Sequence, residues 1–284
     1  MNSCPGYAAA LAVILGLTAA LGIGSSDLFG RRLVAASSVL TAAAVMQVWS
    51  GLFTTGIAAA TASPFQSGPF VWGCVSGLGI GSGLGLYYRG LQKSSATVVA
   101  PLSASIASVV PYWYAVLGAS GATVLAVAGV GVAIVGLVLV TGGAISADRL
   151  LAGVQYGVAS GLAYAATTIA FIEAADGEGL WPVAGQRTVG ALILLTASIL
   201  FGHRLWPPAG QGFNGIASGA LMAMVSISLL AALALDAAPA SVALSTYPVF
   251  SVTVGRVFFA DPLQRSQIAG IGLVVAGIAA VSVG

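Results

Sequence analysis

The sequence predicts an all-α integral membrane protein in which ten transmembrane helices form two inverted five-helix repeats around a central cavity. Three observations support this prediction: the composition, the number of long apolar segments and a weak internal repeat. Of the 284 residues, 58% are hydrophobic and only 6% are charged, and the mean hydropathy is +1.04. Soluble domains carry about 25% charged residues. This chain cannot cover a water-facing surface, so lipid must be its main solvent.

Ten segments are long and apolar enough to cross a bilayer, which takes about 20 residues per helix. The expected spans are 8–29, 37–60, 70–91, 96–117, 122–142, 152–175, 183–202, 212–235, 239–259 and 266–284. The first segment lacks a basic start and is too long for a cleaved signal, so we expect it to be retained. The short connections between spans leave no room for a soluble domain.

The two halves of the chain resemble each other. VAGVGVAIVG (127–136) aligns with IAGIGLVVAG (268–277) at a shift of 141 residues. Because each half has five spans, an odd number, the second half must enter the membrane upside down. The sequence therefore predicts one repeat over residues 1–145 and a second, inverted repeat over 146–284, with a solute site between them near the midplane.

The charges predict the orientation in the membrane. The basic residues at connections that follow odd-numbered spans are Arg31, Arg32, Arg89, Lys93, Arg149, Arg204, Arg256 and Arg265, and the other side holds Glu173, Asp176, Glu178 and Asp236. Short loops rich in Lys and Arg stay in the cytoplasm, so we expect a cytoplasmic (inner or plasma) membrane protein with both termini on the non-cytoplasmic side. The net charge of +2 is too small to indicate a nucleic-acid partner.

Glycine rows predict close helix contacts. In the third span, Gly73, Gly77, Gly81 and Gly85 are four residues apart, and no GK[ST] follows them, so they indicate a smooth helix face and not a phosphate-binding loop. The glycines of spans five and ten are Gly129, Gly136, Gly270 and Gly277. They predict packing either against a second copy, as in a homodimer, or within the same bundle.

Two stretches resemble the EamA-like branch of the drug/metabolite transporter superfamily: YYRGLQKSSATVVAPLSASIASVVPYW (87–113) and ALALDAAPASVALSTYPVFSVTVGRVFFADPLQRSQIAGIGLVVAGI (232–278). Arg187 matches the arginine usual in the seventh span, whereas the second span has Gln47 in its place. The resemblance implies ten helices, a central cavity and alternating-access transport of a small organic solute. The expected solute is an amino acid or related metabolite, and the expected direction is export. It implies no cofactor.

Polar side chains inside spans are costly in lipid and tend to face a cavity or another helix. The predicted substrate-binding residues are Tyr88, Ser105, Ser108, Tyr112, Tyr156, Ser160, Tyr164, Thr168, Arg187, Ser245 and Tyr247. In the sixth span, four of these hydroxyl side chains recur every four residues and form one polar strip. Such a strip either binds substrate or bonds to a neighbouring helix. Pro111 and Pro248 each remove a backbone hydrogen bond, and so act either as hinges or as bends that improve packing.

Four charged or aromatic residues have two interpretations each. Arg187 meets either a substrate carboxylate or one of the acidic residues Glu173, Asp176 and Glu178 at its membrane face. Asp27 either couples to protons or pairs with Arg31 one turn later. Tyr87 and Tyr88 either stack on a substrate or anchor the helix at the interface.

No catalytic or metal-binding residues are predicted. Gly118–Gly121 spells GASG, as in intramembrane serine proteases, but the only histidine, His203, lies in a loop. Cys4 and Cys74 lack metal-ligand spacing, and Asp261 followed by Pro262 indicates only a helix start. A transporter is therefore the expected function, with an intramembrane enzyme or a passive channel as the alternatives.

Overall fold

A computed structural model describes residues 5–94, 96–118, 123–141, 150–260 and 264–283, and this part of the chain is helical without strands. The helices are α1 (Pro5–Ala36), α2 (Val39–Ala60), α3 (Ser67–Lys93), α4 (Ala96–Gly118), α5 (Val124–Thr141), α6 (Leu150–Ala174), α7 (Trp181–Leu200), α8 (Gly212–Leu235), α9 (Ala237–Leu244), α10 (Tyr247–Phe259) and α11 (Arg265–Val283). Each expected span coincides with one helix, except the ninth, which consists of α9 and α10.

The lengths and composition of the helices suit a membrane protein. Within the described residues, seven helical segments are long and apolar enough to span a bilayer, and α9 with α10 counts as one of them. Shorter apolar helices at Leu102–Leu117, Val127–Gly136 and Ile268–Gly277 lie in the expected fourth, fifth and tenth spans. The all-α membrane prediction is thus confirmed.

The connections place the charged residues at two ends of the molecule. At the end that we call the acidic end, the Trp181 indole donates to the carbonyl oxygen of Ser63 at 3.0 Å, which joins the α2–α3 connection to the start of α7. At the opposite end, the basic end, the Thr41 hydroxyl donates to the carbonyl oxygen of Arg204, which joins the start of α2 to the α7–α8 connection. Residues 142–149, which include Arg149, and 261–263, which hold the predicted start of the tenth span, lie outside the described residues.

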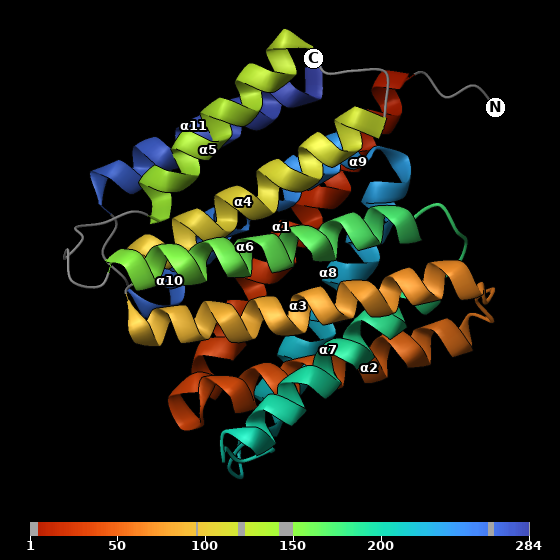
Figure 1. Cartoon of the computed structure of the whole chain (residues 1–284), viewed down its shortest axis with the longest axis vertical. Coiled ribbons are helices and arrows are strands. Elements are labelled where there is room, and N and C mark those ends of the chain that lie inside the picture. The colour runs from red at the N-terminus through yellow and green to blue at the C-terminus, as the bar shows by residue number, and fades with distance from the viewer. Residues whose placement is uncertain (1–4, 95, 119–122, 142–149, 261–263, 284) are drawn as a thin grey trace.

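The helices pack as two bundles, and each bundle contains helices from both halves of the sequence. In the α3 bundle, α3 packs on α6 and α7, and α4 packs on α6. In the α1 bundle, α8 packs on α1 and α2, and α1 packs on α9 and α10. The bundles meet mainly where α2 contacts α7 and α4 contacts α9. Figure 1 shows α3, α4 and α6 side by side in front of α1 and α8, with α5 and α11 together at one edge of the molecule.

The glycine face predicted in the third span is confirmed. A Cβ built on Gly77 would lie 2.5 Å from the carbonyl oxygen of Gln186 on α7, and one built on Gly79 would lie 2.7 Å from the carbonyl oxygen of Ala163 on α6. Real Cβ atoms are not found this close to a neighbouring backbone, so only glycine permits both contacts. Two glycine rows therefore let α3 approach two helices at once. Gly85 has nothing within 4 Å and does not contribute.

The glycines of spans five and ten meet one another within the same chain. A Cβ built on Gly136 of α5 would lie 2.7 Å from the carbonyl oxygen of Gly270 on α11, and one built on Gly277 of α11 would lie 2.5 Å from the carbonyl oxygen of Gly129 on α5. The contacts make α5 and α11 antiparallel neighbours. The two close approaches are related by the same shift of 141 residues that relates the halves of the sequence.

We predict that substituting Gly136 by Val destabilises the protein, whereas substituting Gly131 does not. Gly131 lies on the same helix with open space where its Cβ would be. Overpacking a close contact costs about 1–3 kcal/mol, so the melting temperature of the purified protein in detergent should fall for Gly136→Val alone. On α11, Gly277→Val should likewise lower the melting temperature, whereas the control Gly272→Val should not, because a Cβ at Gly272 would meet open space. Equal melting temperatures for test and control variants would contradict the helix contact.

Candidate functional site

Two groups of polar side chains lie where the bundles meet, and one of them surrounds Arg187. We call this group the arginine network. Its side chains come from α2, α3, α6, α7 and α8, and each is buried: Gln47, Ser76, Thr167, Gln186, Arg187 and Ser226.

Arg187 links the two bundles through neutral partners. Its guanidinium Nε donates to the Ser226 hydroxyl of α8 at 2.7 Å and its Nη1 donates to Oε1 of Gln47 on α2 at 3.1 Å. The side chain is only 2% exposed. Among the described residues, no carboxylate pairs with Arg187, and the nearby Glu173 instead accepts a hydrogen bond from the Tyr114 hydroxyl. The expected ion pair with an acidic residue of this membrane face does not form in the structure.

The network continues inside the α3 bundle. The Ser226 hydroxyl donates to Oε1 of Gln186 at 2.6 Å, and Nε2 of Gln186 donates to the Ser76 hydroxyl at 2.7 Å. The hydroxyl of Ser76 then donates to the backbone oxygen of Thr167 at 2.8 Å, and the Thr167 hydroxyl returns a bond of 3.2 Å to the backbone oxygen of Ser76. Because an unpaired buried polar group costs free energy, the chain of bonds fixes how α2, α7 and α8 fit together.

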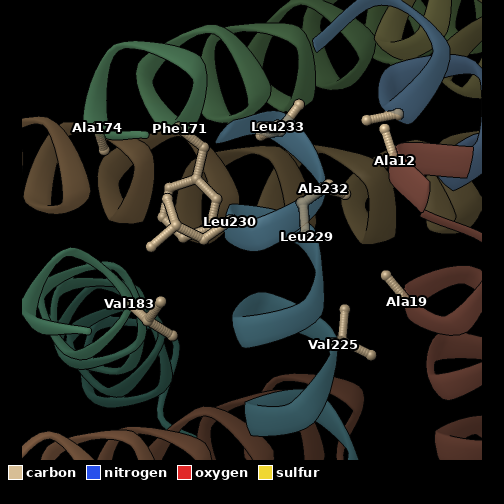
Figure 2. Packing of buried hydrophobic residues seen from close by; sticks show 11 residues of the cluster. Ala12, Ala19, Phe171, Ala174, Val183, Val225, Leu229, Leu230, Ala232 and Leu233 are labelled. Carbon is tan, nitrogen blue, oxygen red and sulfur yellow. The ribbon is translucent and has the colours of Figure 1, made fainter. Parts of the chain in front are cut away.

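An apolar cluster covers the network on the side of the acidic end. Figure 2 shows Phe171 and Ala174 of α6 and Val183 of α7 pointing towards the side chains that α8 and α1 contribute. The buried members of the cluster are Ala12, Ala19, Phe171, Ala174, Val183, Val225, Leu229, Leu230, Ala232, Leu233 and Ala240. They come from both bundles, so apolar side chains join the bundles on this side.

The second group lies between the bundles on the side of the basic end. It consists of Tyr87 and Tyr88 of α3, Tyr164 of α6, Tyr247 of α10 and Asp27 of α1, and we call it the tyrosine cluster. The four phenols lie near one another, and Asp27 lies near Tyr87, Tyr88 and Tyr247. All five side chains are half-buried. In contrast to Arg187, they keep part of their surface open.

Close helix contacts position the tyrosine cluster. The ring of Tyr164 lies against Gly83, whose Cβ would be 3.0 Å from the ring carbon Cδ1. The rings of Tyr87 and Tyr88 are edge to face, with centroids 5.7 Å apart. On the opposite bundle, Asp27 is hydrogen-bonded to Ser251 of α10. Three predicted site residues, Tyr88, Tyr164 and Tyr247, are thus brought together from three helices.

The other predicted residues are placed elsewhere. In the sixth span, Ser160 donates to the Ser103 hydroxyl of α4 at 3.0 Å, and Thr168 donates to its own backbone at Tyr164. The helix-contact interpretation of the polar strip thus holds for Ser160. Tyr156 is half-buried beside Gly90.

The predicted residues of the fourth and ninth spans also face protein more than open space. Tyr112 is buried in an apolar cluster, and its hydroxyl has no partner among the described residues. Ser108 and Ser245 are buried and donate to carbonyl oxygens of their own helices, while Ser105 is half-buried.

The two prolines have different effects on their helices. The ninth span is interrupted at Ser245 and Thr246, directly before Tyr247 and Pro248, and α10 restarts with Pro248 in its first turn. The fourth span is continuous through Pro111. The bend expected at matching depth in both halves is therefore a helix break in the second half alone. Pro248 cannot donate to the carbonyl oxygen one turn back, which agrees with the break.

Several residues of the two groups were not predicted. Gln186 and Ser226 are polar residues within spans, so the cost of burial in lipid was a signal that would have included them. Asp27 and Tyr87 were recognised as polar positions, but their nearness to Tyr247 depends on how α1 packs on α10. Among the residues that the structure describes, no group of three or more His, Cys, Asp or Glu side chains can hold a metal ion. The GASG serine lies outside the described residues.

Comparison with known proteins gives a family match for the second half of the chain. Residues 151–283 match the family model described as "EamA-like transporter family". A solved structure described as "Crystal structure of protein" is similar over 96% of this chain and 97% of its own, with a TM-score of 0.79 and 18% sequence identity. At this identity the similarity shows a common fold alone. A comparison with curated proteins gives no significant match.

We predict that Gln186→Leu lowers stability because it removes one buried hydrogen bond from each of the Ser76 and Ser226 hydroxyls. Loss of a buried partner costs about 1–3 kcal/mol. The melting temperature in detergent should fall, whereas it should stay unchanged for Thr196→Val, which alters an exposed position on the same helix. An unchanged melting temperature for Gln186→Leu would show that the network does not hold the bundles together.

Proposed function

Residues 151–283 belong to the EamA-like transporter family, and from this premise we propose that the chain is a secondary transporter of the drug/metabolite type. It moves a small organic solute, an amino acid or related metabolite, outward across the cytoplasmic membrane. The family match is the observation that carries this proposal, because this family consists of transporters. A catalytic role has no support from the two polar groups, which contain no activated nucleophile beside a base.

The inverted repeat is part of the proposal. Equivalent helices of the two halves have equivalent packing partners. The third helix of the first half, α3, packs on α6 and α7, which begin the second half. The third helix of the second half, α8, packs on α1 and α2, which begin the first half. The paired contacts of α5 and α11 follow the same exchange. These observations support repeats over residues 1–145 and 146–284 that are related by an axis in the membrane plane.

The solute path runs between the α3 bundle and the α1 bundle. The tyrosine cluster takes Tyr88 and Tyr164 from one bundle and Tyr247 from the other, so movement of one bundle against the other changes the site. The closed apolar cluster and the arginine network separate this site from the acidic end. We take the structure as a state with access from the basic end, which the positive-inside rule places in the cytoplasm.

The helix break before Pro248 is the proposed hinge. It divides the ninth span directly beside Tyr247, so rotation of α10 against α9 would move a ring of the site. Hinges usually lie at the ends of helical elements that absorb a change in backbone angles. Pro111, in a continuous helix, has the weaker support for this role.

We predict that the purified protein in proteoliposomes takes up a labelled solute saturably and that Tyr164→Leu abolishes this uptake. A panel of amino acids, organic amines, nucleosides and cationic dyes would find the solute. Tyr164 lies against Gly83 of α3 and near the other three phenols of the cluster. Tyr7, 68% exposed on α1, is far from Tyr164 in the chain and serves as the Tyr→Leu control. Uptake that rises linearly with concentration would indicate a channel, and formation of a new product would indicate an enzyme.

A further inference from the structure

We infer that an anionic phospholipid binds to the outer face of the α3 bundle, with one acyl chain in a groove between α3 and α7 and its phosphate beside Arg89. This lipid is a partner of the protein and not the transported solute, so its binding goes beyond the proposed function and does not depend on it. The lining of the groove, its place along the helices and the charge at its end support this occupant.

The groove is apolar and lies on the surface of the molecule. It has a volume of about 480 Å³, and its walls come mainly from α7, with Leu78 from α3. Among its lining residues only Thr196 has a polar side chain. Leu78 is 53% exposed and Leu192 is 57% exposed. Within a transmembrane span such side chains meet lipid tails, so an acyl chain is the natural occupant of the groove.

The groove lies where α3 and α7 separate. A Cβ built on Gly81 would lie 2.9 Å from Cβ of Ile193, so the two helices are in contact at this level. One turn nearer the basic end, a Cβ built on Gly85 would have nothing within 4 Å. Figure 1 shows α3 and α7 diverging in the same direction. The close contact of the two helices thus gives way to open space towards the basic end.

The length of the groove matches one leaflet of the membrane. Its lining on α7 runs from Val189, in the middle of that helix, to Leu200 at the end of it. A helix rises about 1.5 Å per residue, which gives the groove a length of about 17 Å. Half of the hydrocarbon core of a bilayer is about 15 Å thick. One acyl chain of the leaflet at the basic end therefore fits along the groove.

A positive charge lies at the end of the groove. The Arg89 guanidinium is 6.0 Å from the ring centroid of Phe201, which lines the groove. Arg89 is exposed, and no carboxylate of the described residues pairs with it. Lys93, one turn further along α3, is exposed as well. Because the planar guanidinium suits phosphate oxygens, a lipid phosphate can bind to Arg89 while the attached chain lies against Phe201.

Two other occupants fit this end of the groove less well. Two copies of the chain in one membrane have the same orientation, so a symmetric contact through the groove would bring the Arg89 side chains of both copies to the same end, where they repel each other. A zwitterionic lipid has the same acyl chains, but its cationic group offsets the charge of its phosphate. Anionic lipids are attracted to exposed basic residues at the membrane surface, and the cytoplasmic leaflet, where we place the basic end, contains them.

Native mass spectrometry of the purified full chain in detergent tests the inference with dioleoyl phosphatidylglycerol and dioleoyl phosphatidylcholine, which have the same acyl chains and differ in net charge. We expect the first phosphatidylglycerol to bind about fivefold more tightly or better, since one basic residue at the membrane surface contributes about this factor. Arg89→Gln should lower the preference by about the same factor, and Arg89→Lys should retain most of it.

Arg265→Gln is the matched control for the charge. Arg265 is exposed at the basic end on α11, a helix that packs mainly on α5. This variant should keep the preference of the unaltered protein for phosphatidylglycerol. Elution volume and melting temperature confirm that each variant is folded.

Ala197→Phe tests the groove itself. Ala197 lines the groove, and a phenyl ring there would fill the space of the acyl chain, so both lipids should bind more weakly. Ala220→Phe, the same substitution at an exposed position of α8, should bind both lipids as the unaltered protein does.

Three results would each overturn the inference: equal affinity for the two lipids, an unchanged preference in Arg89→Gln, or unchanged binding in Ala197→Phe. A dimer mass that Ala197→Phe converts to a monomer would also overturn it, because a second copy of the chain would then be the occupant of the groove. Since lipid binding is measured without any solute, none of these results decides whether the protein is a transporter.

Discussion

The structure depends on close contact between helix backbones, because helices in lipid gain little by burying apolar side chains against one another. Small residues let backbones approach, and the attraction then comes from van der Waals contact and hydrogen bonds. In this chain Gly77 and Gly79 place α3 directly against α7 and α6, and Gly136 and Gly277 join α5 to α11. Once the backbones are this close, polar side chains such as Gln186 and Ser76 can reach each other within the bundle.

The same packing gives the two ends of the molecule different character. Towards the acidic end, Phe171 and Val183 are fully buried among side chains from both bundles. Arg187 of the α3 bundle donates hydrogen bonds to side chains of the α1 bundle. Towards the basic end, the rings of Tyr88, Tyr164 and Tyr247 are only half-buried. A molecule closed at one end with a partly open polar group behind it has the arrangement expected of one state of a carrier.

Much of the fold could be predicted from the sequence because lipid imposes simple rules. Apolar length determined the spans, and the glycine rows of the third, fifth and tenth spans determined which faces are smooth. What could not be predicted is which helices meet. Nothing in a local pattern places Tyr247 beside Tyr88, or Gln47 beside Arg187, since these contacts join residues about half the chain apart. The expected partner of Arg187 was acidic, because charge is visible in a sequence whereas a buried glutamine of a distant helix is not. The serines of the fourth and sixth spans were placed in the site on polarity alone, but Ser160 bonds to Ser103 and holds two helices together.

The most direct test of the account is a distance measurement between spin labels on the two bundles at both ends of the molecule. One pair joins Glu178 before α7 to Leu235 at the end of α8, and the other joins Gln92 of α3 to Val257 of α10, all at exposed positions. A transported solute is added to the labelled protein in liposomes. If the bundles rock about the site, the first distance should lengthen in a fraction of the molecules, and the second distance should shorten in an equal fraction. Two distances that stay unchanged while the solute is transported would contradict alternating access between these bundles.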